Sequence, residues 1–296
     1  MAYVVRALPV NKNFRAFAVE CKDIVETVRK LQNLSPIASA ALGRALAGVA
    51  LLSADLKTGK ILLQINGGGP LGEILAEGNY KGELRGTVKN PYVYLEIKDK
   101  KLPVGEAVGK NGFISVVRDL GLKNVYQSSS KLISGEIAED LAYFLTVSEQ
   151  IPSAVSLGVL VGTDGSILAA GGFLIQKLPE ASEEEIAELE KILKSFPPTT
   201  ALLSQGKTPE DILIMIFSEI EILERRELKY KCNCSEERVE NMLVALGEKE
   251  LEDLVKKKEP VEVICHFCRK KYVVPLEKVK AILEELKSKK LKGGMK

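Results

Sequence analysis

The amino-acid sequence predicts an α+β protein with an N-terminal domain of antiparallel strands packed with helices, a helical linker and a small cysteine-rich C-terminal domain. Strand-like alternation and helix caps are interspersed in the first part, and four of the five cysteines fall in the last quarter. The 296 residues, 46% of them hydrophobic, can fill a sizeable core. The formal net charge of +2 excludes a uniformly basic protein. We expect the three parts to be residues 1–178, 179–230 and 231–296.

The first 178 residues contain the predicted strands. Short runs with alternating polarity indicate them, and a Gly-Gly-Gly-Pro sequence indicates a turn between two of them. The expected strands are residues 3–10, 14–21, 60–66, 71–77, 84–89, 92–97 and 112–120. Asp164-Gly165 joins two further apolar runs and predicts a hairpin. Most of these strands should pair antiparallel.

Two helices are predicted in the same part, over residues 36–54 and 134–149. Ser35 supplies an N-cap and Pro36 a first-turn proline for the first of them. That helix is rich in alanine and glycine and carries Arg44 near its middle, which favours a tightly packed helix over a membrane span. The chain begins without a secretory signal pattern. We therefore expect a cytoplasmic protein with no membrane anchor.

The linker, by contrast, is acidic and helical. Residues 180–228 carry 12 acidic and five basic side chains. Ser182 and Glu185 form a capping box before an amphipathic run, and Thr208 begins a second helix. The end of this second helix is apolar all round, so another part of the protein must cover it. Its candidate apolar surface consists of Ile212, Leu213, Met215, Ile216 and Phe217. In the C-terminal domain, helices are expected over residues 235–246 and 275–289.

The C-terminal cysteines form two close pairs, Cys232-Asn-Cys234 and Cys265-His-Phe-Cys268, with thirty residues between them. Each pair can supply half of a tetrahedron, so the pattern predicts one Cys₄ zinc site. His266 is then a neighbour, because four sulfurs complete the shell. A catalytic zinc site usually needs histidine or carboxylate ligands, and the chain has one histidine. A thioredoxin-like oxidoreductase would leave the Cys-x-Cys pair unexplained.

The four cysteines also predict a redox switch. A domain of about 60 residues has little core of its own, so the roughly 10–16 kcal/mol of zinc binding is also folding energy. Basic neighbours are expected to offset the charge of the thiolates, namely Lys229, Lys231, Arg269, Lys270 and Lys271. An oxidant that joined the cysteines within each pair would remove all four ligands. The domain would then unfold and uncover the apolar helix of the linker.

Three further motifs accompany the cysteine pattern: GGGPL at 67–71, SGEIAEDLAY at 134–143 and SEQIPS at 148–153. Together they extend over essentially the whole chain and resemble the 33 kDa chaperonin family, the redox-regulated heat shock proteins. The resemblance implies an ATP-independent holdase that is inactive when reduced and zinc-bound. On oxidation such a protein releases zinc, unfolds its C-terminal switch and, often as a homodimer, protects unfolding client proteins from aggregation.

The resemblance also assigns roles to individual cysteines. It implies zinc ligation by Cys232, Cys234, Cys265 and Cys268 and, in the oxidised form, the disulfides Cys232–Cys234 and Cys265–Cys268. Cys21 has no counterpart in the pattern and is expected to be a buried small hydrophobe. No catalytic residue is implied, so we expect no enzyme activity.

A zinc-ribbon nucleic-acid-binding protein is the alternative. Residues 269–296 carry ten basic and three acidic side chains, which could neutralise phosphates. The near-neutral chain and its aromatic content of 5% argue against this alternative, because stacking platforms need aromatic side chains. We therefore expect no specific nucleic acid as a partner. The glycines of GGGPL are not followed by Gly-Lys-Ser/Thr, so no ATP site is expected either.

Overall fold

The protein folds into two units. The computed structural model describes residues 1–97, 101–122 and 124–293, with side chains up to residue 288. The first unit is Met1–Lys231 and the second is Cys232–Lys296. Strands and helices occur in both, which confirms the α+β class. The expected linker, residues 179–230, falls within the first unit, because its helices and strands pack against the sheets of that unit.

The first sheet has five strands in the order β10-β1-β2-β9-β8, all antiparallel. The strands are β1 (Tyr3–Pro9), β2 (Phe14–Glu20), β8 (Ser153–Val161), β9 (Ile167–Lys177) and β10 (Ile220–Glu227). β8 and β9 form the expected hairpin, in which Gly165 has a φ of 82°, a value that glycine adopts readily. No strand is expected at β10, whose sequence is largely charged. It forms because β1 offers it an edge to pair with.

The second sheet has six strands in the order β11-β5-β4-β3-β6-β7. The strands are β3 (Lys60–Asn66), β4 (Ile74–Asn79), β5 (Glu83–Val88), β6 (Phe113–Asp119), β7 (Tyr126–Lys131) and β11 (Lys229–Tyr230). The expectation of a strand at 92–97 is wrong, because these residues join no ladder with a described strand. Val93 and Leu95 pack on the core while Tyr92 and Tyr94 are exposed. The alternating polarity therefore reflects an extended, half-buried segment.

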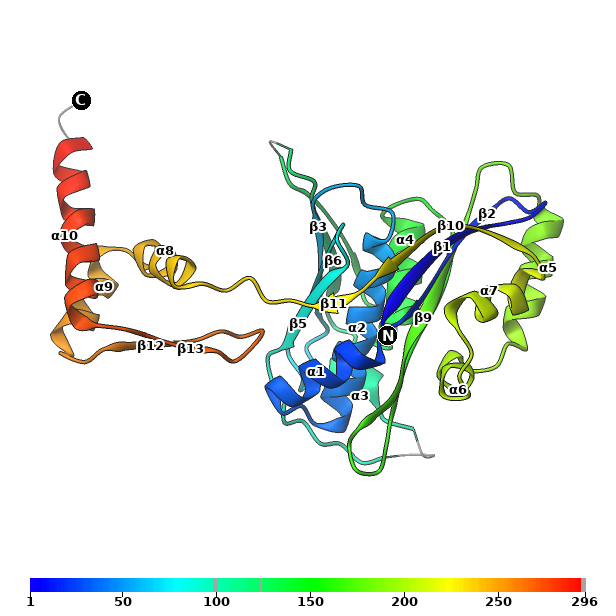
Figure 1. The fold of residues 1–296 in the computed structure, drawn as a ribbon, viewed down its shortest axis with the longest axis horizontal. Helices are drawn as coiled ribbons and strands as arrows, with labels where there is room; N and C mark the ends of the chain where they lie inside the picture. The colour runs from blue at the N-terminus through cyan, green and yellow to red at the C-terminus, as the bar shows by residue number, and fades with distance from the viewer. Residues whose placement is uncertain (98–100, 123, 294–296) are drawn as a thin grey trace. The chain divides into compact units, whose positions relative to one another are not determined.

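Helix α2 (Pro36–Ser53) lies in the core of the first unit and contacts strands of both sheets (Figure 1). As predicted, the Ser35 hydroxyl caps it by accepting a hydrogen bond from the Ala38 N–H. By length and composition α2 could span a membrane, but 83% of the segment is buried inside the protein. A Cβ on Gly48 would lie 3.3 Å from a terminal methyl carbon of Leu141, so glycine allows α2 to pack closely at this point.

Three shorter helices complete the N-terminal part: α1 (Lys22–Gln32), α3 (Val104–Val108) and α4 (Ala138–Val147). α4 begins four residues later than expected. The carboxylate of the fully buried Asp140 accepts hydrogen bonds from the backbone N–H groups of Ile133, Ser134 and Ile137. These bonds fix residues 133–137 as a loop, so the acidic residue acts here as a structural cap.

Helices α5 (Glu183–Lys194), α6 (Thr199–Ser204) and α7 (Pro209–Phe217) lie beside the first sheet (Figure 1). The predicted capping box of Ser182 with Glu185 is present, and the helix expected to begin at Thr208 also starts with a capping box, formed by Thr208 and Asp211. Of the candidate apolar surface, Ile212, Leu213 and Ile216 are buried against the sheet, Met215 is 44% exposed and Phe217 is half-buried. The cover of α7 is therefore the first unit itself.

The second unit is a small α/β module. It consists of α8 (Glu236–Leu246), α9 (Glu248–Lys256), β12 (Val261–Ile264), β13 (Lys271–Val274) and α10 (Leu276–Gly293), with β12 and β13 antiparallel. The two predicted helices are present, and α9 was not expected. Eight buried side chains form the core: Val239, Leu243, Leu251, Tyr272, Val274, Val279, Ile282 and Leu283. A core of this size is marginal without a cross-link.

Candidate metal centre

An extended segment and a turn of the second unit bring the four predicted cysteines together. Cys232 and Cys234 lie in the extended segment before α8, whose N-cap hydroxyl on Ser235 accepts a hydrogen bond from the Arg238 N–H. The other pair lies in the turn between β12 and β13. There the Cys265 N–H donates to the carbonyl of Lys270, and Arg269 adopts a φ of 60°. The segment before α8 thus holds one pair of cysteines, and the turn between β12 and β13 holds the other.

The sulfur atoms have the spacing of a tetrahedral metal site. All four lie within 4.8 Å of one another. Cys232 Sγ is 3.6 Å from Cys265 Sγ, and Cys234 Sγ is 3.4 Å from Cys268 Sγ. Zinc–sulfur bonds of about 2.3 Å in a tetrahedron separate the sulfurs by about 3.8 Å. The donor set and its spacing therefore fit one zinc ion ligated by these four cysteines.

Each sulfur has a different hydrogen-bonding environment. The pKa of the Cys234 thiol is lowered to about 7: burial opposes the thiolate, but hydrogen bonds from the Tyr272 hydroxyl and the neighbouring cysteines outweigh it. Burial raises the pKa of Cys268 to about 12 and also raises the pKa of Cys232, against backbone N–H donors that favour the charged form. The Tyr272 hydroxyl and the neighbouring thiols therefore favour the thiolate form of Cys234, whereas burial disfavours it at Cys232 and Cys268.

The four cysteines are neither sealed nor fully exposed. Each of them is half-buried. Cys21, by contrast, is fully buried in the first unit, and burial raises the pKa of its thiol well above the ordinary range. The structure thus confirms that Cys21 is a buried hydrophobe.

The basic neighbours do not act as expected. Lys229 and Lys231 both pair with the Glu83 carboxylate, at 3.8 and 2.7 Å. These pairs belong to the first unit, because β11 adds to the edge of β5. Lys270 lies over the Tyr272 ring. The reason is that pairing of β11 with β5 brings Lys229 and Lys231, which follows β11, to the Glu83 carboxylate, a contact that the sequence alone does not reveal.

Tyr272 is the residue of the site that the cysteine pattern misses. Its hydroxyl lies 3.0 Å from Cys234 Sγ. The signal in the sequence is weak: an aromatic residue four positions after Cys268, at the start of the short apolar run Tyr272 to Val274. Only pairing of β12 with β13 turns the tyrosine inward toward the sulfurs.

Comparisons with known proteins match nearly the whole chain. The family model described as Hsp33 protein matches residues 2–275. The 33 kDa chaperonin of Caldanaerobacter subterraneus subsp. tengcongensis is 46% identical over 288 residues, which cover 96% of this chain and 98% of that protein. That of Thermodesulfovibrio yellowstonii is 45% identical over 288 residues, covering 97% of this chain and 100% of that protein.

A solved structure is also similar. The crystal structure of the 33 kDa chaperonin of Thermotoga maritima, a heat shock protein 33 homologue, superimposes with a TM-score of 0.87 at 40% identity. The match covers 96% of this chain and 98% of that chain. Sequence, fold and cysteine quartet thus agree, and the chain belongs to the Hsp33 family of 33 kDa chaperonins.

Proposed function

We propose that this protein is a redox-regulated, ATP-independent holdase. When reduced and zinc-bound it is inactive; on oxidation it forms disulfides, loses zinc, unfolds its second unit and protects unfolding proteins from aggregation. One observation carries the proposal: four half-buried cysteine sulfurs lie within 4.8 Å of one another in a unit whose own core is small. Such a unit depends on its cross-link, and its cross-link can be oxidised.

The chemistry requires only the cysteines and a peroxide. Bound zinc would supply a cross-link between the two halves of the unit and keep the sulfurs as thiolates. A thiolate attacks the peroxide O–O bond, which leaves a sulfenic acid and one hydroxide. The second thiolate of the pair attacks the sulfenic sulfur, the S–O bond breaks, and a disulfide and a second hydroxide form.

We assign the disulfides to Cys232–Cys234 and Cys265–Cys268, following the sequence pairs. The sulfur contacts that run between the pairs, Cys232 to Cys265 and Cys234 to Cys268, belong to the reduced, ligating arrangement. A disulfide across a single residue closes a small, strained ring, which makes it easy to reduce again. Reversibility is what a switch needs.

Activation must also reach the first unit, because the cover of α7 lies there. Cys232 lies two residues after β11, a two-residue strand at the edge of the second sheet, and β11 follows β10, an edge strand of the first sheet. α7 is tied to the first sheet by the buried Glu210, which accepts a hydrogen bond from the Tyr3 hydroxyl and pairs with Arg225 on β10. We expect release of β10 and β11 to loosen this tie and expose Ile212, Leu213 and Ile216 to clients.

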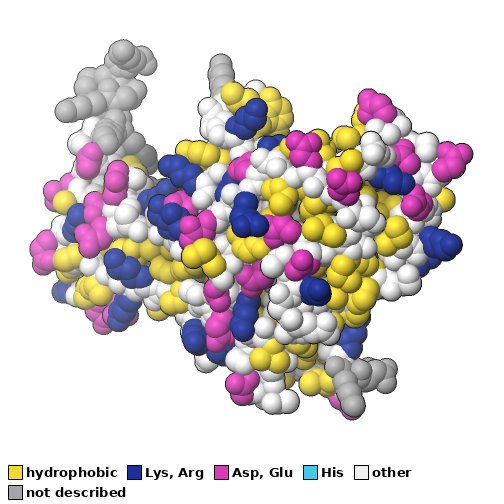
Figure 2. Space-filling model, turned by 45° about the vertical axis from the view of Figure 1, so that its right-hand side comes forward, with side chains coloured by type: hydrophobic (Ala, Val, Ile, Leu, Met, Phe, Trp, Pro, Cys, Tyr) yellow, Lys and Arg dark blue, Asp and Glu magenta, His cyan; other side chains and the backbone are white. Residues whose placement is uncertain are grey.

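The remaining assignments follow from the same proposal. Clients are unfolding proteins recognised by exposed apolar surface, the active form is a homodimer, and the compartment is the cytoplasm. No enzymatic activity and no specific nucleic-acid partner are proposed. In support, lysine, arginine and carboxylate side chains are intermixed on the face that Figure 2 shows, and a single-sign field would suit a nucleic acid better.

The test is to treat the full chain with hydrogen peroxide and follow three signals together: zinc release, suppression of the aggregation of a chemically unfolded enzyme, and mass spectrometry of the disulfides. We expect zinc loss and client protection to rise in parallel and reverse with a dithiol reductant. Zinc loss without client protection would contradict the holdase function. Salt-sensitive binding of a DNA duplex in place of client protection would favour the nucleic-acid-binding alternative.

A further inference from the structure

A tyrosine outside the cysteine quartet reaches one of the sulfurs. The Tyr272 hydroxyl donates a hydrogen bond to Cys234 Sγ over 3.0 Å. The tyrosine is 5% exposed and packs in the core of the second unit with Val239 and Val274. Packing therefore fixes the ring, and the hydroxyl approaches the sulfur from one defined direction.

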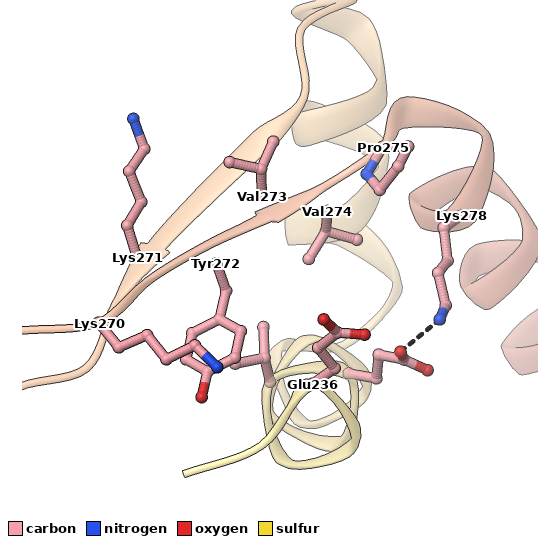
Figure 3. Close-up of a pocket in the computed structure, with 10 residues that line it drawn as sticks. Glu236, Lys270, Lys271, Tyr272, Val273, Val274, Pro275 and Lys278 are labelled. Atoms are coloured by element: carbon pink, nitrogen blue, oxygen red, sulfur yellow. Dashed lines mark hydrogen bonds and ion pairs between the residues drawn. The ribbon is translucent and has the colours of Figure 1, made fainter.

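A lysine strengthens this donor. Lys270 Nζ lies 4.8 Å from the centroid of the Tyr272 ring. Figure 3 shows the two side chains on the same side of β13, with the ammonium group beside the ring. A cation at an aromatic face interacts with the negative charge of that face and draws electron density toward itself. The phenolic O–H becomes a better hydrogen-bond donor as a result.

The donor differs in kind from those at two other sulfurs. Cys232 receives the backbone N–H of Cys234, and Cys268 receives the backbone N–H of Lys270. Those bonds belong to the path of the chain, and a side-chain substitution leaves them in place. The bond to Cys234 comes from a side chain, and exchange for phenylalanine deletes it while keeping the ring.

We propose, on the basis of the redox switch described above, that Tyr272 is a positioning residue of the metal centre that slows its oxidation. Its hydroxyl orients Cys234 toward the other three sulfurs and draws electron density from that sulfur. A thiolate that accepts a hydrogen bond is a weaker nucleophile toward the O–O bond of a peroxide. Tyr272 therefore sets how readily the switch is triggered, although it is neither a ligand nor a redox group.

The test compares Tyr272→Phe with the wild-type full chain, both loaded with zinc and reduced. Loss of a partner that orients a ligand typically weakens metal binding by 10–100-fold, so we expect zinc affinity, measured by competition with a chromophoric chelator, to fall by about tenfold. Hydrogen peroxide should release zinc faster. In the cobalt-substituted protein, the thiolate-to-metal charge-transfer band should move to longer wavelength, because the Cys234 sulfur becomes richer in electrons.

Two control variants separate this role from general weakening. Val279→Ala removes fully buried side-chain volume from the same core but leaves the hydroxyl in place. Tyr3→Phe deletes a tyrosine hydroxyl that donates to Glu210 in the first unit. Both should keep the wild-type cobalt band, and Tyr3→Phe should also keep the wild-type zinc affinity.

Each outcome is decisive. Wild-type values of zinc affinity, release rate and cobalt band in Tyr272→Phe would overturn the proposal, and so would a band shift of equal size in Val279→Ala. If the wild-type protein binds zinc but peroxide neither releases it nor elicits client protection, the proposed function fails. The affinity and the cobalt band then still decide whether Tyr272 positions Cys234.

Discussion

The two units of the protein obtain their stability by different means. In the first unit, α2 lies between two sheets, and large side chains such as Phe17, Leu46 and Phe144 are almost completely buried. In the second unit, eight buried side chains support three helices and one two-stranded ribbon. Burial of apolar side chains can stabilise the first unit, and an oxidant does not remove this contribution. Under the proposed function, the second unit relies on a metal cross-link through four sulfurs, so an oxidant would unfold this unit and leave the first unit folded.

Removing the cross-link should have the largest effect. With Cys265→Ser, or with a strong chelator under reducing conditions, the second unit should lose its fold, because about 10–16 kcal/mol of metal binding is folding energy in such modules. Hydrogen exchange followed by mass spectrometry should show loss of protection in α8, α9 and α10. Protection in α2 should be unchanged.

The matched control is Cys21→Ala, which removes a thiol from the first unit and no ligand. It should bind zinc like the wild type. If Cys265→Ser exposes α2 as well, the two units are one cooperative structure and the comparison fails.

A cavity in the core of the first unit should lower stability less than loss of the metal ligands does, and it should affect the first unit instead of the second. Leu46 on α2 is fully buried, so Leu46→Ala should destabilise the first unit by about 2–5 kcal/mol. Urea unfolding of the reduced protein, followed by circular dichroism, measures this cost. Zinc affinity should stay at the wild-type value, and a parallel loss of affinity would contradict the independence of the second unit.

Acid should produce the smallest change, within the first unit. The pKa of Glu185 is lowered from 4.5 to about 2, because the backbone N–H groups of Ser182 and Asn13 donate to its carboxylate. A carboxyl group with a lowered pKa stabilises the fold above its unfolded value, and this contribution is lost as pH falls through the folded value. The N-terminal turn of α5 should therefore loosen between about pH 4.5 and pH 2.

This loosening is measured by amide exchange of α5 across that pH range. Glu185→Gln should weaken the capping box at neutral pH. In this variant the amide exchange of α5 should no longer change between about pH 4.5 and pH 2. An unchanged pH profile in Glu185→Gln would show that another group is responsible.

Local sequence signals were reliable where a residue acts on its own neighbours. The Ser35 cap, the Ser182–Glu185 capping box, the helix start at Thr208 and the Asp164-Gly165 hairpin all appear where they are predicted. The same local reasoning predicts a strand at residues 92–97, which pairs with none of the described strands, and it misses the edge strand β10, because the sequence of β10 is largely charged. Strand pairing depends on a distant segment, so local alternation alone cannot decide it.

The sequence by itself determined the family resemblance and the cysteine quartet, because two close pairs at a domain-sized separation need only be brought together by folding. Only the tertiary structure decided what surrounds them. Pairing of β12 with β13 turns Tyr272 toward Cys234, and pairing of β11 with β5 directs Lys229 and Lys231 to Glu83. The physical reason is the range of the interactions. The spacing of the ligands can be read from neighbouring positions in the sequence, whereas a hydrogen bond or an ion pair between distant residues forms only when the strands pair in one register.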